Sequence, residues 1–162
     1  MKNALIVIAA QNDYLTDGRF PLWDIETTLM RISDKILEFK KNDCAIIFIQ
    51  HLSPLGSAFF DETTKGCELI SQLTNLSQDH FVVTKRHGNS FDETHLDDLL
   101  ITHNIEHIEL CGMMTQNCVL FTTIAEQAKK YKITVLGNCC TSVSPVIHAV
   151  ALKGLSRITN VI

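Results

Sequence analysis

Cys118 is the residue whose type and setting best fit covalent catalysis. It follows the segment Cys111-Gly-Met-Met-Thr-Gln-Asn, which is typical of a strand end, a turn and the first residues of a helix. Thr115 is expected to cap that helix, because its hydroxyl can accept a hydrogen bond from a backbone N–H of the first turn. The positive end of a helix favours a thiolate, and its free N–H groups can bind a developing oxyanion. The segment therefore predicts a cysteine nucleophile that attacks a carbonyl carbon.

An unreactive buried thiol is the competing interpretation of Cys118, since free cysteine is among the most buried residue types. The remaining cysteines keep that interpretation, because nothing beside them in the sequence would activate a thiol: Cys44, Cys67, Cys111, Cys139 and Cys140. There is no Cys-x-x-Cys pair, and a chain of this length needs no disulfides to fold. Reduced thiols in a cytoplasmic protein are therefore expected.

Short apolar runs alternate with longer segments of helical periodicity, and these elements must position the chemistry. The expected strands are 4–8, 45–50, 80–84, 107–111, 133–136 and 158–162, mostly continuous Ile, Val, Leu or Phe as in strands covered on both faces. The expected helices are 25–41, 93–102, 116–131 and 145–155. This alternation predicts an α/β fold, a three-layer α/β/α domain with a mostly parallel sheet. The irregular loops after its strands, 17–23, 52–64 and 86–92, are expected to ring a ligand crevice.

Bulk composition fits one ordinary globular domain and argues against two classes of partner. The chain has 162 residues, of which 46% are hydrophobic and 20% charged. A net charge of −4 without a basic cluster argues against a nucleic-acid partner. No apolar stretch reaches the roughly 20 residues that a membrane-spanning helix needs. Neither a nucleic-acid partner nor a membrane is therefore expected.

The segment Gly112-Met-Met-Thr-Gln-Asn-Cys-Val119 resembles the nucleophile motif of the isochorismatase-like cysteine hydrolases, which include nicotinamidases and N-carbamoylsarcosine amidohydrolases. In that motif a cis peptide bond joins the two residues before the threonine and aims one backbone N–H at the substrate carbonyl. The resemblance therefore implies a cis bond between Met113 and Met114. It also implies that the N–H groups of Met114 and Cys118 form the oxyanion hole.

The segment Val83-Thr-Lys-Arg-His-Gly-Asn-Ser-Phe91 resembles the lysine segment of the same family. It implies that Lys85, which alone would be interpreted as a solvated lysine at a strand end, supports the thiolate electrostatically. Segments 94–100 and 137–152 continue the match, so the resemblance covers nearly the whole chain. It implies a single hydrolase domain over residues 1–162 with strand order 3-2-1-4-5-6, no cofactor, and a homo-oligomer (a dimer or tetramer).

Ala9 is the main departure from the family pattern. The run Ala4-Leu-Ile-Val-Ile-Ala-Ala-Gln-Asn-Asp-Tyr14 resembles the family's first strand, where Asp occupies the place of Ala9. In the family's mechanism that carboxylate takes the cysteine's proton and then delivers it to the leaving amine. Losing a general acid–base group costs about 10²–10⁴-fold in rate, so strong impairment is expected. Three interpretations stay open: a deliberate inactivating substitution, a natural pseudoenzyme, or an enzyme with a rearranged base. The first is favoured, because the rest of the catalytic set matches the family pattern.

The resemblance implies hydrolysis of a C–N bond in a small amide or carbamoyl-type substrate, through a thioester on Cys118. It places these side chains in the substrate pocket: Tyr14, Phe20, Met113 and Asn117. The alternatives are a ligand-binding or assembly domain of the same fold, and isochorismatase-type vinyl-ether hydrolysis, which does not need the cysteine. No metal is expected, because the stretch Gln50-His51-Leu52 lacks the Asp-x-His pair of metal-binding relatives.

Overall fold

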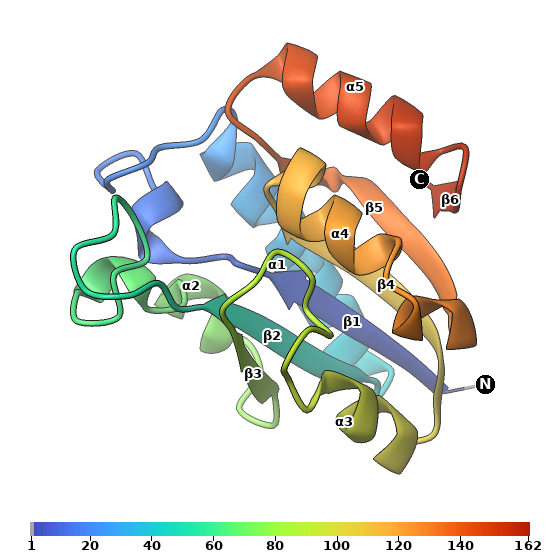
Figure 1. Ribbon diagram of the computed structural model, residues 1–162. Helices are drawn as coiled ribbons and strands as arrows, with labels where there is room; N and C mark the ends of the chain where they lie inside the picture. The colour runs from blue at the N-terminus through green and yellow to red at the C-terminus, as the bar shows by residue number, and fades with distance from the viewer. Residues whose placement is uncertain (1) are drawn as a thin grey trace.

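A computed structural model describes residues 2–162 and shows a six-stranded sheet between two layers of helices (Figure 1). The strands are β1 (Lys2–Ile8), β2 (Ala45–His51), β3 (Phe81–Lys85), β4 (Ile105–Met113), β5 (Lys132–Thr141) and β6 (Asn160–Val161). All neighbouring strands are parallel, in the order β3-β2-β1-β4-β5-β6. The predicted fold class and the strand order implied by the resemblance are confirmed.

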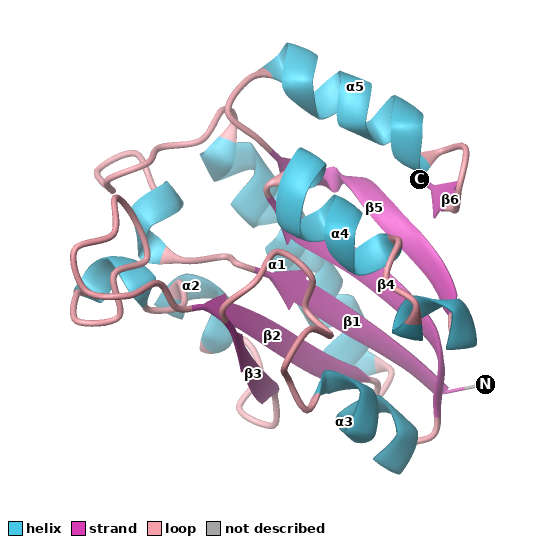
Figure 2. Cartoon of the chain, viewed as in Figure 1, coloured by secondary structure: helices cyan, strands magenta, loops and turns pink. Residues whose placement is uncertain are grey.

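Helices cover both faces of the sheet, as crossovers between parallel strands require. The α-helices are α1 (Ile25–Lys41), α2 (Ser71–Thr74), α3 (Leu96–Thr102), α4 (Leu120–Thr123) and α5 (Pro145–Leu155). Figure 2 shows α1 behind the sheet and α3, α4 and α5 in front of it. Short turns of other helix types are η1 (Asn12–Tyr14), η2 (Lys65–Cys67), η3 (Thr115–Val119) and η4 (Gln127–Lys130). No helix among residues 2–162 has the length and apolarity needed to cross a membrane.

The predicted helix over 116–131 is wrong. The chain instead forms the π-type turn η3, the single α-helical turn α4 and the 3-10 turn η4. The run Val119-Leu-Phe-Thr-Thr-Ile124 is rich in β-branched residues, which lose side-chain freedom in a helix. The Thr123 hydroxyl also donates to the Val119 carbonyl at 2.8 Å. The helix predicted over 93–102 begins later, at Leu96.

The core centres on β1, the sheet's inner strand. From Ala4 to Ile8 every residue is fully buried, because helices cover both faces of that strand. Burying an Ile, Leu or Val side chain contributes roughly 1.5–3 kcal/mol relative to leaving it exposed. The amphipathic face of α1 seals one side with buried side chains: Leu29, Ile32, Ile36 and Phe39. This packing fixes the carboxyl end of β1, where the candidate site begins.

Candidate active site

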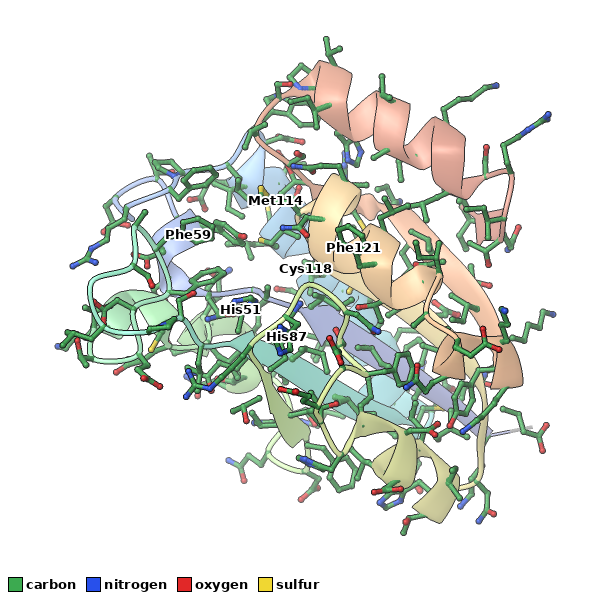
Figure 3. The ribbon with its side chains drawn as sticks, in the orientation of Figure 1. His51, Phe59, His87, Met114, Cys118 and Phe121 are labelled. Carbon is green, nitrogen blue, oxygen red and sulfur yellow. The ribbon has the colours of Figure 1, made fainter. Side chains whose placement is uncertain are left out.

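The carboxyl ends of β1, β3 and β4 bring Ala9, Lys85 and η3 to one edge of the sheet; η3 (Thr115–Val119) carries the predicted nucleophile and is called the nucleophile turn below. Ala9 follows β1, Lys85 ends β3, and Cys118 lies in η3 directly after β4. All three side chains are buried, with exposed fractions of 0%, 2% and 3%. Figure 3 shows Cys118 in the middle of this edge, with the other labelled side chains around it.

Gly112 allows β4 to approach β1 closely enough to place the nucleophile turn. Its φ is +120°, and a Cβ there would lie 2.1 Å from the Ile8 carbonyl oxygen. The peptide bond between the following two residues, Met113 and Met114, is cis. The Met114 carbonyl then accepts hydrogen bonds from the N–H groups of Asn117 (3.1 Å) and Val119 (3.3 Å). These bonds close the turn that carries Cys118.

Thr115 does not cap the helix, so that prediction is wrong. No side chain caps the start of η3. The buried Thr115 hydroxyl instead donates to the Thr141 carbonyl at 3.0 Å, and its Oγ1 lies 2.8 Å from His148 Nδ1. Both partners come from distant segments, β5 and α5. The hydroxyl bonds to them instead of accepting a hydrogen bond from a backbone N–H of its own turn. Thr115 therefore ties the nucleophile turn to its neighbours.

Lys85 is a buried cation next to Cys118. Its ammonium donates to the Gly88 carbonyl at 2.7 Å, and no carboxylate among residues 2–162 forms an ion pair with it. Burial lowers the pKa of Lys85, whereas the charge of a Cys118 thiolate and a hydrogen bond to it act in the opposite direction. The thiolate is thus the anion that can compensate this ammonium.

Ala9 occupies the point where the resemblance requires an acid. Its φ is +50°, a left-handed conformation in which Asn and Asp are several-fold enriched over other non-glycine residues. Its N–H donates to the Ile49 carbonyl at 2.9 Å, which holds β1 against β2 beyond the regular ladder. The methyl side chain of Ala9 cannot accept or donate a proton, so it cannot act as the general acid–base group that the resemblance places there.

Asp13, the nearest carboxylate in the sequence, is used as an anchor. It is 2% exposed, and its Oδ2 accepts a 2.7 Å hydrogen bond from the Phe60 N–H. Gln11, also fully buried, holds the same region. Its Nε2 donates to the carbonyls of His51 and Cys67, both at 2.7 Å, and its Oε1 accepts from the His51 N–H at 2.7 Å. Together these side chains fix the loop after β2 beside the site.

An aromatic wall lines one side of the site and consists of Tyr14, Phe20, Phe59 and Phe60. Tyr14 meets Phe60 edge to face with ring centroids 4.7 Å apart, and Phe20 stacks on Phe59 at 4.8 Å. Burial, followed by the charges of Cys118 and Asp13, raises the pKa of Tyr14, so its phenol stays neutral. Such rings offer a flat apolar surface beside the thiol.

Of the four predicted pocket residues, Tyr14 and Phe20 lie in the aromatic wall. Asn117 is half-buried in η3, where its side chain approaches Gly88, and Met113 is fully buried at the end of β4. Phe59 was not predicted as a pocket residue from the sequence, because it lies in an irregular loop. The pair of adjacent phenylalanines after a predicted strand could have indicated it.

Basic and histidine side chains form the rim beside Lys85. Burial lowers the pKa of His51 to about 4, with smaller contributions from the charges of Lys85, His87 and Arg86. His87 and Arg86 are exposed, and each pairs with a carboxylate of a neighbouring segment: His87 Nε2 with Glu93 at 3.1 Å, and Arg86 with Glu62 at 2.6 Å. His51 is therefore neutral near pH 7 and acts there as a polar wall residue.

No group of three or more His, Cys, Asp or Glu side chains able to hold a metal ion comes together among residues 2–162. Two surface cavities, of about 390 and 600 Å³, lie beside the η1 turn and at the amino ends of the strands. Neither is lined by Cys118 or Lys85. Both cavities therefore lie away from the pair of Lys85 and Cys118.

Comparisons with known proteins agree with this geometry. The isochorismatase domain model matches residues 3–162. The uncharacterized isochorismatase family protein YddQ of Bacillus subtilis is 27% identical over 88% of this chain and 79% of its own length. The secreted isochorismatase effector Isc1 of Verticillium dahliae is 31% identical over 74% of this chain and 62% of its own. The crystal structure of an isochorismatase-like hydrolase from Alkaliphilus metalliredigens superimposes with a TM-score of 0.89 at 26% identity, covering 99% of this chain and 94% of that one.

Proposed function

This chain belongs to the isochorismatase family, and from that premise we propose that it is a cysteine hydrolase for the C–N bond of a small amide or carbamoyl-type substrate. The observation that carries the proposal is the buried pair at the carboxyl edge of the sheet, formed by Lys85 at the end of β3 and Cys118 in η3. A buried cation beside a thiol favours the thiolate, which is the nucleophilic form. A merely structural cysteine needs no such neighbour.

In the proposed reaction the Cys118 thiolate attacks the substrate carbonyl carbon and forms a tetrahedral intermediate. The backbone N–H groups of Met114 and Cys118 stabilise its oxyanion. The C–N bond then breaks as the nitrogen gains a proton, and water opens the resulting thioester. In the family mechanism the carboxylate at position 9 moves these protons. With Ala9 in place, the expected rate is about 10²–10⁴-fold below that of a chain with the acid.

The aromatic wall supports a substrate whose acyl group is flat or apolar. Phe20 and Phe59 are only partly buried, so their stacked rings can contact a bound molecule. Vinyl-ether hydrolysis fits less well, because it depends on the missing acid and leaves the Lys85–Cys118 pair without a role. A domain kept only for binding would likewise have no use for an activated thiol.

The proposal is tested by restoring the acid with Ala9→Asp and assaying a panel of small aromatic and aliphatic amides for released ammonia. Ala9→Asn is the matched control, because it adds the same volume without an acid. The unaltered chain should release ammonia about 10²–10⁴-fold more slowly than Ala9→Asp, and Ala9→Asn should be as slow as the unaltered chain. Cys67 is the control thiol, because it is similarly buried and burial raises its pKa. If iodoacetamide alkylates Cys118 at neutral pH no faster than it alkylates Cys67, the proposal is overturned.

A further inference from the structure

One buried hydroxyl joins three elements around the nucleophile turn. Thr115, at the start of η3, donates to the Thr141 carbonyl at the end of β5, while its Oγ1 lies 2.8 Å from Nδ1 of His148 in α5. A threonine hydroxyl has one proton and two acceptor lone pairs. Because that proton is used on the Thr141 carbonyl, His148 Nδ1 must carry a hydrogen and donate it to Thr115.

Trp23 closes these contacts into a ring. Its indole lies 5.7 Å from the His148 imidazole, measured between ring centroids. The Trp23 backbone carbonyl accepts a hydrogen bond from the Thr141 hydroxyl. The Trp23 backbone N–H donates to the Ser142 carbonyl at 2.9 Å. The segment after η1, which also carries Phe20 of the aromatic wall, is thereby linked through His148 and Thr115 to the nucleophile turn.

From this arrangement we propose that His148 is a positioning residue for the nucleophile. It holds Thr115 in place, and through Thr115 it fixes the turn that presents the Cys118 thiol and its backbone N–H. The inference rests on the proposed function, because it takes Cys118 as the nucleophile. A turn displaced by about 1 Å would be enough to weaken attack strongly, since reacting groups must be held in a near-attack geometry. His148 acts only through Thr115 and is not itself a catalytic residue.

The test measures alkylation of Cys118 by iodoacetamide across a pH series, followed by peptide mass spectrometry. The pH midpoint reports the thiolate fraction, and the plateau at high pH reports access to the sulfur. The titratable side chains that interact with this sulfur, Lys85 from β3 and Tyr14 from η1, stay unchanged in every variant. His148→Ala should raise the midpoint by at least about half a unit, or roughly threefold less thiolate at a given pH below the midpoint.

Two further variants separate positioning from a general loss of stability. His148→Asn should restore the original midpoint, because the asparagine amide nitrogen can donate from the place of Nδ1. Thr115→Val, which keeps the volume but removes the hydroxyl, should reproduce the shift of His148→Ala. The double variant should shift no further than Thr115→Val alone, since that variant already removes the contact between Thr115 and His148. If His148→Ala fails to fold, Thr115→Val and His148→Asn give the same comparison.

His107→Ala is the matched control. His107 Nε2 lies 3.0 Å from the Thr134 hydroxyl, so a second His–Thr contact joins β4 and β5, but near the amino ends of those strands. This variant should leave the midpoint unchanged. Equal shifts in His107→Ala and His148→Ala, or no shift in His148→Ala and Thr115→Val, would overturn the positioning role. Slow alkylation of Cys118 in the unaltered chain would instead overturn the proposed function, so the two failures are distinguishable.

Discussion

The backbone N–H of Phe60 donates a 2.7 Å hydrogen bond to Oδ2 of Asp13, so a buried carboxylate ties the loop after β2 to the turn after β1. Gly66 packs against the same carboxylate, and a Cβ there would lie 2.2 Å from Oδ1. The aromatic wall therefore depends on Asp13 for its shape. Because this carboxylate is committed to backbone contacts, it is poorly placed to replace the missing base.

Asp13→Asn should lower the free energy of unfolding by about 1.5–3 kcal/mol, because a hydrogen bond to a buried charged acceptor is lost or weakened. Urea denaturation at neutral pH measures the change. The control is Asp17→Asn, an exposed neighbour, which should change stability by less than about 0.5 kcal/mol. An Asp13→Asn variant as stable as the control would contradict the anchoring role.

Lys85→Met should leave stability unchanged or raise it, because it replaces a buried ammonium that has no carboxylate partner within residues 2–162 with an apolar chain of similar length. In an Ala9→Asp background the same substitution should destabilise, since it would strand the new carboxylate. The effect of Lys85→Met on stability should thus have opposite signs in the two backgrounds. Thermal melting of the four chains of this double-mutant cycle tests whether position 9 faces Lys85. Additive effects of the two substitutions would show that it does not.

Gly112→Ala should abolish folding or cost several kcal/mol, because its Cβ would lie 2.1 Å from the Ile8 carbonyl oxygen at a φ of +120°. Gly154→Ala is the opposite case. A Cβ at Gly154 meets no atom within 4 Å, and the residue lies inside α5, so this variant should gain roughly 0.5–1 kcal/mol. Circular dichroism melts of both variants provide the measurement. Equal effects at the two glycines would refute the close approach of β4 to β1.

His51 should make stability depend on pH in the acid range. Its pKa falls from 6.5 in the unfolded chain to about 4 in the fold, first because of burial and then because of Lys85, His87 and Arg86. The unfolded state therefore binds more protons in this window, and stability is lost as the pH falls from 6.5 to about 4. His51→Gln should flatten the profile of urea midpoints over this range, whereas exposed His95→Gln should not. Imidazole NMR titration gives the His51 pKa directly.

The exposed face of α5 should carry the self-association that the family resemblance implies. Only Leu155 of this helix is buried, whereas Val146 and Val150 are 70% and 68% exposed one turn apart. Apolar residues of this face flank a groove of about 400 Å³ that has no charged lining residue. Val150→Glu should lower the mass measured by light scattering. Val82→Glu, on the edge strand β3, should not.

The sequence predicted the sheet well and the local structure around Cys118 less well. Continuous apolar runs such as Ala4–Ile8 can be recognised without knowing their partners. The partners of Thr115 lie 26 and 33 residues further along the chain, in β5 and α5. Local capping rules cannot anticipate such a choice, because it depends on how the fold brings distant segments together. The same holds for Gln11, whose three hydrogen bonds all reach segments beyond β1.

The left-handed backbone at Ala9 bears on how easily an acid can be placed at position 9. Aspartate adopts a φ near the observed +50° more readily than alanine does. Replacing the side chain therefore requires no change in the path of the main chain, and the hydrogen bond to the Ile49 carbonyl can stay as it is. Under the proposed function, Ala9→Asp is the one substitution that supplies the acid, and it can be made in either direction without rebuilding the scaffold.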